Sequence, residues 1–164
     1  KMTLLNRIYH KSQTTINRLW EARSPDLPFT TKKDAITLAS IVEKETAIAS
    51  ERQKIAGVFV NRLRKNMRLQ ADPTVIYAIT QGQYPFSRKL NKKDLKINSP
   101  YNTYLYKGLP PSAISSPGKS ALEAVLNPPN TKELYFVANR KGGHNFSSSL
   151  KEHNNHVKKY RNAK

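Results

Sequence analysis

Leu38-Ala-Ser-Ile-Val-Glu-Lys-Glu-Thr46 is the most apolar helical pattern in this 164-residue chain, and it holds two of the 11 acidic residues. At about 100° per residue, Glu45 falls on the same helical face as Leu38 and Ile41. Glu43 lies well off that face. The pattern predicts a helix packed in the core, with the carboxyl group of Glu45 directed to the core side.

A carboxyl group on the core side of a helix can carry acid–base chemistry. Because burial disfavours the ionised form, Glu45 is able to stay protonated near neutral pH and to act as a general acid. Two structural interpretations stay open at this point. Glu45 either pairs with an arginine, or it closes the end of the helix.

Capping patterns predict where the neighbouring helices begin. Thr31 and Asp34 form a capping box, with Asp in place of the usual Glu, in front of a helix over residues 32–46. Ser50 and Gln53 form a second capping box that introduces the next helix. The sequence therefore predicts two consecutive helices with a short connection between them.

Prolines mark the elements that follow. Asp72-Pro73 predicts the start of another helix, with Asp at the N-cap and Pro in the first turn. Residues 82–111 have no regular apolar pattern and are predicted to form a long loop. Long loops inside compact domains often have a function. Ser116-Pro117 predicts a short helix that Pro128-Pro129 stops.

The C-terminal part contains the strongest strand signal. Leu134-Tyr-Phe-Val137 predicts a strand, and Arg140-Lys-Gly-Gly143 predicts a turn that returns the chain, so a β-hairpin is expected. Ser149 and Glu152 cap a last helix. Helices thus predominate around one small hairpin, which predicts the α+β fold class.

The N-terminal region predicts a helix of its own. Residues 2–23 carry apolar side chains at helical spacing, with Arg and Lys between them. Ser24-Pro-Asp-Leu-Pro28 ends this helix, because its two prolines remove backbone donors and push the preceding residues out of the helical region. We therefore expect an N-terminal helical region of residues 1–24 and a main domain of residues 25–164.

The chain is strongly basic, with 29 Lys and Arg against 11 Asp and Glu and a formal net charge of +18. Such a charge suits nucleic acid, anionic lipid or an anionic wall polymer. The basic residues are scattered, however, and no zinc-finger, RRM or KH motif is present. Nucleic acid is therefore not the expected partner, and a solvated basic surface accounts for the charge.

The sequence predicts no metal ion and no cofactor. It has no cysteine, and its four histidines lack acidic neighbours at ligand spacing apart from Glu152. It also lacks a Gly-rich phosphate loop and a G-x-S-x-G turn. Its hydrophobic content of 37% is enough for a buried core, which excludes wholesale disorder.

Residues 69–77 and 101–104 mix polar and aromatic side chains in the manner of a carbohydrate site. Aromatic faces take the apolar side of a pyranose ring, and amide and carboxylate groups fix its hydroxyl and N-acetyl groups. The candidate substrate-binding residues are Gln70, Asp72, Thr74, Tyr77, Tyr101, Asn102 and Tyr104. A role in capping or loop packing stays open for each of them, above all the N-cap role for Asp72.

Taken together, eight segments resemble the YceG-like family of endolytic murein transglycosylases, in the family's order. They are Leu38–Thr46, Ala49–Arg52, Val58–Leu63, Leu69–Tyr77, Tyr101–Tyr104, Gly108–Pro111, Tyr135–Ala138 and Gly142–His144. The resemblance covers roughly residues 33–160, and so many matched segments are far more specific than any single motif.

The resemblance implies a fold and an activity. It implies a mainly helical, lysozyme-like transglycosylase domain that cleaves the β-1,4 bond between N-acetylmuramic acid and N-acetylglucosamine within nascent peptidoglycan. One glutamate acts first as acid and then as base, without metal and without hydrolysis, and leaves a 1,6-anhydro-N-acetylmuramic acid end. Glu45 is the expected catalytic residue because Glu45-Thr46 is similar to the Glu-Ser pair of other lytic transglycosylases. Glu43 is the runner-up, since the family pattern contains both.

The resemblance also implies a setting. Family members carry an N-terminal membrane helix and a wall-binding region, so residues 1–24 are expected to be the tail of a preceding region. The expected location is the periplasmic, outer face of the bacterial cytoplasmic membrane, with peptidoglycan strands as substrate and peptidoglycan synthases as partners. The alternative is a noncatalytic basic module that binds wall glycan or nucleic acid. A nucleic-acid module would leave Glu45 without a role, whereas a wall-binding module would differ from the enzyme only in whether Glu45 lines an open groove.

Overall fold

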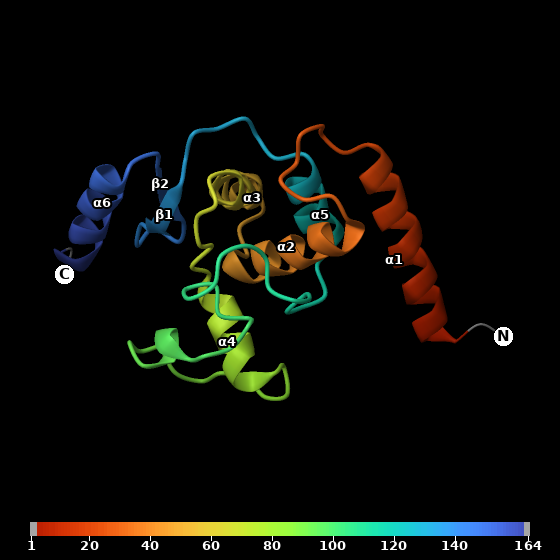
Figure 1. The fold of residues 1–164 in the computed structure, drawn as a ribbon, viewed down its shortest axis with the longest axis horizontal. Coiled ribbons are helices and arrows are strands. Elements are labelled where there is room, and N and C mark those ends of the chain that lie inside the picture. The colour runs from red at the N-terminus through yellow and green to blue at the C-terminus, as the bar shows by residue number, and fades with distance from the viewer. Residues whose placement is uncertain (1–2, 163–164) are drawn as a thin grey trace.

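The computed structural model describes residues 3–162 and contains helices and one two-stranded sheet (Figure 1). The helices are α1 (Leu4–Glu21), α2 (Lys32–Glu45), α3 (Ala49–Arg64), α4 (Asp72–Thr80), α5 (Lys119–Leu126) and α6 (Leu150–Asn162), with a 3₁₀ turn, η1, at Asp94–Lys96. The strands are β1 (Tyr135–Ala138) and β2 (His144–Ser147), which pair antiparallel. The predicted α+β class is confirmed.

The start of α2 is the predicted capping box. The Oγ1 of Thr31 accepts a hydrogen bond from the backbone N–H of Asp34 at 3.1 Å, and it donates to the Asp34 carboxylate at 2.6 Å. The predicted N-cap of α3, Ser50, is wrong by two residues, and the predicted capping box does not form. The helix begins at Ala49 with Ile48 as its N-cap and no side-chain cap, because the Oγ1 of Thr46 accepts the N–H of Ile48 at 3.0 Å and turns the chain earlier.

The core lies where α2, α3 and α5 pack against one another, in the middle of the molecule in Figure 1. Its largest fully buried side chains include Leu38 and Ile41 of α2 and Phe59 of α3. The α2 face that the sequence marks as apolar is therefore the face that is buried. This packing fixes the direction of α2 and so determines where its last residue, Glu45, emerges.

The prediction for the start of α5 is also corrected. Residues 114–118 run along α2, where the N–H of Ile114 donates to Ser40 Oγ at 3.0 Å and the Oγ of Ser115 donates to the Ser40 carbonyl at 3.0 Å. Because these contacts hold the chain off a helical path, α5 begins after Gly118 and not at Ser116-Pro117.

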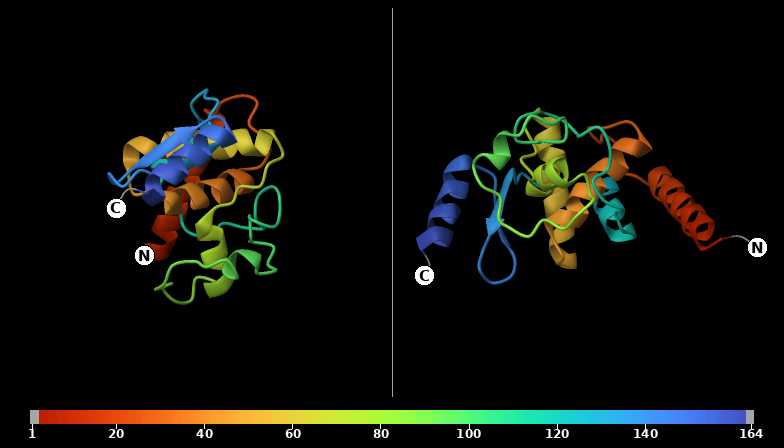
Figure 2. Two further views of the ribbon diagram at one scale, coloured as in Figure 1. Left: turned by 90° about the vertical axis from the view of Figure 1, so that its left-hand side faces the viewer. Right: turned by 90° about the horizontal axis from the view of Figure 1, so that it is seen from below.

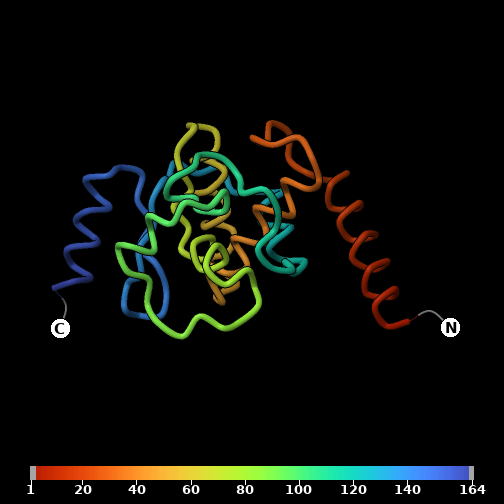
Figure 3. Tube along the Cα trace, turned by 60° about the horizontal axis from the view of Figure 1, so that its bottom comes forward, coloured from red at the N-terminus to blue at the C-terminus, as the bar shows by residue number. Residues whose placement is uncertain are grey.

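The helix α1 reaches the core only with its C-terminal half. Ile16 and Leu19 are buried, whereas Leu4, Leu5 and Ile8 are exposed. Figures 2 and 3 show the opposite half projecting away from the rest of the chain, with the two termini at opposite ends. The boundary at residue 24 stays a prediction. Within residues 3–162 no helix has the length and apolarity that a membrane crossing requires.

The hairpin lies between α3 and α6 (Figure 2). One face turns to α3, where the ring of Phe136 meets that of Phe59 edge-on with 5.8 Å between centroids. The other face turns to α6, where Tyr135 stacks on His153 with 5.1 Å between centroids. The predicted turn and both strands are confirmed, and the cross-strand partner of Ala138 is His144.

Asn102 organises the long loop that faces α4. Its side-chain amide donates to the carbonyls of Leu95 at 3.1 Å and Ile97 at 2.8 Å, and its Oδ1 accepts the N–H of Tyr104 at 2.9 Å. The residue is fully buried. This one side-chain amide therefore joins three points of the loop.

Replacing Asn102 by Ala is expected to lower the free energy of unfolding by about 2–4 kcal/mol. Three buried backbone groups lose their partner, and each such group costs on the order of 1–3 kcal/mol with partial relaxation. Chemical denaturation of the two proteins measures the difference. Asn154→Ala, at an exposed position of α6, is the matched control and should change stability by less than about 0.5 kcal/mol. Equal stability of the two variants would refute this role of Asn102.

Candidate active site

A cavity of about 430 Å³ opens at the C-terminal end of α2. It is bounded by that helix end, α3, the segment before α4, the loop at residue 104, the hairpin and α6. Its lining residues are Glu45, Arg62, Leu69, Gln70, Asp72, Tyr104, Phe136, Val137, Ala138, His144, His153 and Val157. Six segments of the chain thus converge on one small space.

Glu45 is the last residue of α2, and its half-buried side chain lines this cavity. Burial raises the pKa of Glu45 to about 8, with a further increase from the charge of Asp72 and a smaller opposing effect from Arg62. A carboxyl group with this pKa is mostly protonated at neutral pH. It is therefore poised to donate a proton to a bound substrate.

The side chain of Glu43 points away from the cavity that Glu45 lines. Its Oε2 accepts the backbone N–H of Gly118 at 3.0 Å, at the residue that caps α5. A carboxylate at a helix N-terminus satisfies an unpaired N–H group and complements the helix dipole. This contact gives Glu43 a structural role and takes it away from the cavity that Glu45 enters.

The structure corrects the N-cap interpretation of Asp72. The N-cap of α4 is Ala71, without a side-chain cap, and Asp72 occupies the first turn. One carboxylate oxygen of Asp72, Oδ1, instead accepts the hydroxyl of Tyr104 at 2.6 Å. Burial, followed by this bond, raises the pKa of Tyr104. Two carboxyl groups, those of Glu45 and Asp72, therefore line the same cavity.

Gln70 also lines this cavity, as the sequence predicts for a substrate contact. Its backbone has a φ of 52°, in the left-handed region. The guanidinium Nη1 of Arg62 donates to the carbonyl of Leu69 at 2.7 Å and reaches the Oε1 of Gln70 at 3.4 Å. Arg62 thus holds the bend that presents Gln70.

Thr74 and Asn102 do not reach the cavity. Both side chains are fully buried. The hydroxyl of Thr74 donates to the carbonyl of Ala71 at 2.7 Å and lies 2.8 Å from that of Thr103, so it locks the loop onto the start of α4. Neither side chain lines the cavity, and the polar atoms of both are used inside the protein.

Tyr77 lines a second cavity of about 600 Å³ on the other side of Lys44 and Pro73. Its ring packs against that of Tyr101 with 4.8 Å between centroids, and the hydroxyl of Tyr101 lies 2.6 Å from that of Ser112. Tyr101 therefore supports the wall of the second cavity from behind. Lys44 and Pro73, which line this second cavity, are the sequence neighbours of Glu45 and Asp72, which line the first.

Arg62 and the hairpin are site features that the sequence analysis missed. Arg62 is buried, and its Nε donates to the carbonyl of Leu134 at 2.6 Å, which joins α3 to the strand β1. His144 and Phe136 enter the cavity from the hairpin. The sequence signals were present in the matched segments 58–63 and 142–144, but the first suggested only a helix and the second only a turn.

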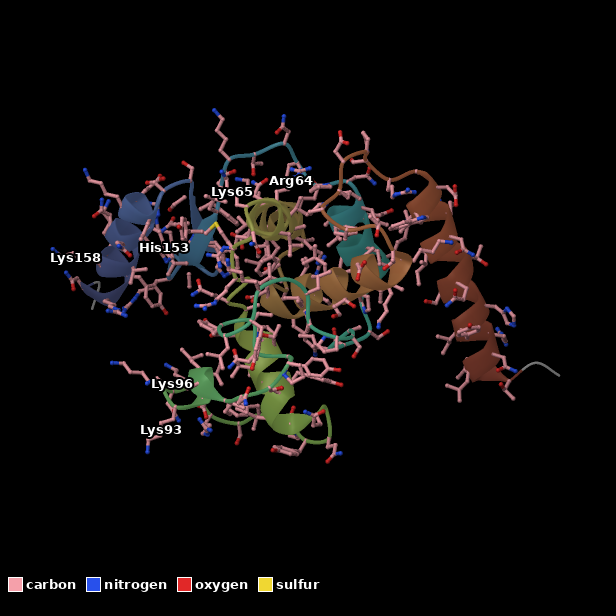
Figure 4. The ribbon with its side chains drawn as sticks, viewed as in Figure 1. Arg64, Lys65, Lys93, Lys96, His153 and Lys158 are labelled. Carbon is pink, nitrogen blue, oxygen red and sulfur yellow. The ribbon has the colours of Figure 1, made fainter. Side chains whose placement is uncertain are left out.

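His153 of α6 closes the cavity beside Val157, and Figure 4 shows this histidine between α6 and the hairpin. Burial lowers the pKa of His153, and Arg62 and His156 add to this effect.

Within residues 3–162, no three His, Asp or Glu side chains form a cluster suited to a metal ion. Figure 4 also shows Lys93 and Lys96 together at η1, and Lys158 apart from them on α6.

The chain belongs to the YceG-like family, whose model matches residues 1–159. It is 46% identical over 129 residues to an endolytic murein transglycosylase of Bacillus subtilis, covering 79% of this chain and 35% of that protein. It is 37% identical over 138 residues to an endolytic murein transglycosylase of Streptococcus pneumoniae, covering 82% of this chain and 25% of that protein. The chain therefore spans about a quarter to a third of the length of these relatives.

A solved structure shares the fold. A yceG-like protein from Listeria monocytogenes superposes with a TM-score of 0.71 at 40% sequence identity, covering 92% of this chain and 44% of that one. This likeness covers nearly all of the chain, and it supports the α+β assignment independently of the sequence pattern.

Proposed function

We propose that this chain is the catalytic part of an endolytic murein transglycosylase, which cleaves the β-1,4 bond between N-acetylmuramic acid and N-acetylglucosamine within peptidoglycan strands. The observation that carries the proposal is Glu45, a carboxyl group with a pKa of about 8 inside a cavity. Membership in the YceG-like family supports the same substrate class. A noncatalytic basic module would have no use for a protonated acid in such a place.

The proposed reaction uses Glu45 twice. The protonated carboxyl group donates its proton to the glycosidic oxygen as the bond from this oxygen to C1 of the muramic acid breaks. The C6 hydroxyl of the same muramic acid then forms a bond to C1, and its proton passes to the carboxylate of Glu45. Glu45 ends protonated as it began, and the glycan ends in a 1,6-anhydro ring.

Incubating the chain with purified murein sacculi tests the proposal directly. We expect soluble fragments whose muramic acid ends are anhydro rings, identified by chromatography and mass spectrometry. Intact sacculi after prolonged incubation would contradict the proposed activity. The proposed location at the outer face of the cytoplasmic membrane, and the proposed association with peptidoglycan synthases, need separate experiments in cells.

Replacing Asp72 by Asn is expected to move the alkaline limb of the pH profile to lower pH. The charge of Asp72 disfavours the ionised form of Glu45, so its removal lowers the pKa of Glu45. Ionised Glu45 cannot donate a proton, and cleavage then fails at a lower pH than in the parent chain. The profile of kcat/KM against pH, measured with soluble glycan strands, reports this limb.

The control for this prediction is Glu43→Gln, which removes a carboxylate bound outside the cavity at Gly118. Its alkaline limb should coincide with that of the parent chain. If Asp72→Asn also leaves the limb in place, Asp72 does not set the protonation of Glu45.

A further inference from the structure

His144 is held at the cavity wall by a carboxylate from another element. Glu51, in the first turn of α3, accepts the backbone N–H of His144 through Oε1 at 2.8 Å. Its second oxygen, Oε2, lies 2.7 Å from the ring Nδ1 of the same histidine. The two side chains are 93 residues apart in sequence and are mostly shielded from solvent, with 18% and 16% of their side-chain surface exposed.

The neighbours of this pair leave it little freedom. A Cβ atom on Gly143 would lie 2.5 Å from Oε1 of Glu51, so only glycine allows the carboxylate to approach the backbone here. The ring of Phe136 meets the ring of His144 edge-on, with 5.4 Å between centroids. Burial alone would raise the pKa of Glu51, but the hydrogen bonds from the side chain and backbone of His144 outweigh it and lower that pKa. The carboxylate is therefore ionised and selects a proton on Nδ1.

In the tautomer with its ring proton on Nδ1, His144 has Nε2 as a hydrogen-bond acceptor on the opposite edge of the ring. Among the other polar groups that line the cavity, Arg62 is a donor and one oxygen of Asp72 already accepts the hydroxyl of Tyr104, whereas Nδ1 of His153 has no hydrogen-bond partner. A sugar presents O–H and acetamido N–H groups that need acceptors when they lose water.

We propose that His144 binds the glycan directly, with its Nε2 accepting a hydrogen bond from a hydroxyl or acetamido N–H of the sugar, and that Glu51 is the positioning residue that holds it in this tautomer. This assignment rests on the proposed function, since it places a glycan strand in the cavity of Glu45. It gives the hairpin a part in substrate recognition.

Glu51→Gln is the sharpest test because it keeps the shape of the side chain. The amide oxygen can still accept the N–H of His144, and the amide NH₂ then faces Nδ1 as a donor, which moves the ring proton to Nε2. Nε2 of His144 thereby changes from a hydrogen-bond acceptor to a donor. We expect ¹⁵N NMR of the imidazole to show the tautomer change, and the Kd for soluble uncrosslinked glycan strands to rise about tenfold.

Binding is measured in a Glu45→Gln background, so that catalysis does not remove the ligand. His144→Phe is the second variant, and it should raise Kd to a similar extent because it lacks any acceptor. Glu123→Gln, the same chemical change at an exposed acid of α5, is the matched control and should leave Kd unchanged. Melting curves identify any variant that does not fold. If either Glu51→Gln or His144→Phe fails to fold, the other is sufficient for the test.

The outcomes separate the two proposals. An unchanged Kd in folded His144→Phe, or in Glu51→Gln with a switched tautomer, overturns the assignment of His144. A raised Kd together with undiminished cleavage by the Glu45→Gln chain supports it while refuting the catalytic proposal.

Discussion

Replacing Glu45 by Gln is expected to abolish glycan cleavage while the fold is retained. Gln keeps the size and hydrogen-bonding capacity of the side chain, but it has no proton to give to the leaving oxygen. Loss of a general acid typically costs on the order of 10²-fold or more in rate. Release of soluble fragments from murein sacculi, measured against time, reports the loss, and circular dichroism reports the fold.

Glu43→Gln is the matched control, two residues away on the same helix. The Oε1 of the new glutamine can still accept the N–H of Gly118, so both stability and cleavage should stay close to those of the parent chain. Retention of more than about a tenth of the activity in Glu45→Gln would reject Glu45 as the general acid. Loss of activity in Glu43→Gln alone would transfer that role to Glu43.

The pKa of Glu45 gives the same variant a signature in stability. The pKa of Glu45 in the folded chain, about 8, lies above the ordinary glutamate value of 4.5, so between these pH values the folded chain holds a proton that the unfolded chain has lost. Stability therefore falls as pH rises from about 4.5 to about 8. Gln cannot ionise, so the Glu45→Gln variant does not lose stability in this way as the pH rises. The melting temperature of the variant should therefore exceed that of the parent chain most clearly at pH 9. This is the expected cost of holding a neutral acid in an active site.

Local signals made much of the fold predictable from the sequence. The capping box at Thr31 and the hairpin turn each depend on residues within a few positions of one another, and both are confirmed. The start of α3 was not predictable in this way. Its connection is turned by Thr46, whose hydroxyl binds the N–H of Ile48, and the apparent capping box at Ser50 goes unused.

The site was predictable only in part, because its remaining contacts are long-range. Helical spacing was enough to direct Glu45 to the core side. It could not show that Arg62 joins α3 to the carbonyl of Leu134, or that Glu51 meets His144 across 93 positions. Composition pointed to Asn102 as a polar group for sugars, whereas tertiary packing uses it to fold a loop. Spacing along a chain reports neighbours on one element and not the partners that packing supplies.

The product of the reaction is the feature that separates a lytic transglycosylase from a hydrolase. Hydrolytic glycosidases use two carboxyl groups about 5–9.5 Å apart, one as acid and the other as nucleophile or as the base that activates water. This cavity holds Glu45 and Asp72. Asp72 is engaged by the hydroxyl of Tyr104 and raises the pKa of Glu45. We assign to Asp72 the role of keeping Glu45 protonated, and not that of activating water.

No residue of the cavity is assigned the role of activating water, so the C6 hydroxyl of the muramic acid is the expected nucleophile. An intramolecular hydroxyl gains from a proximity that a free water molecule lacks. Fragments should therefore end in anhydro rings that are about 18 Da lighter than reducing ends, since the water of hydrolysis is never added. Digestion in H₂¹⁸O should leave the new ends unlabelled. Reducing ends that carry ¹⁸O would refute the lytic mechanism, and their disappearance in Asp72→Asn would identify Asp72 as the base that activates water.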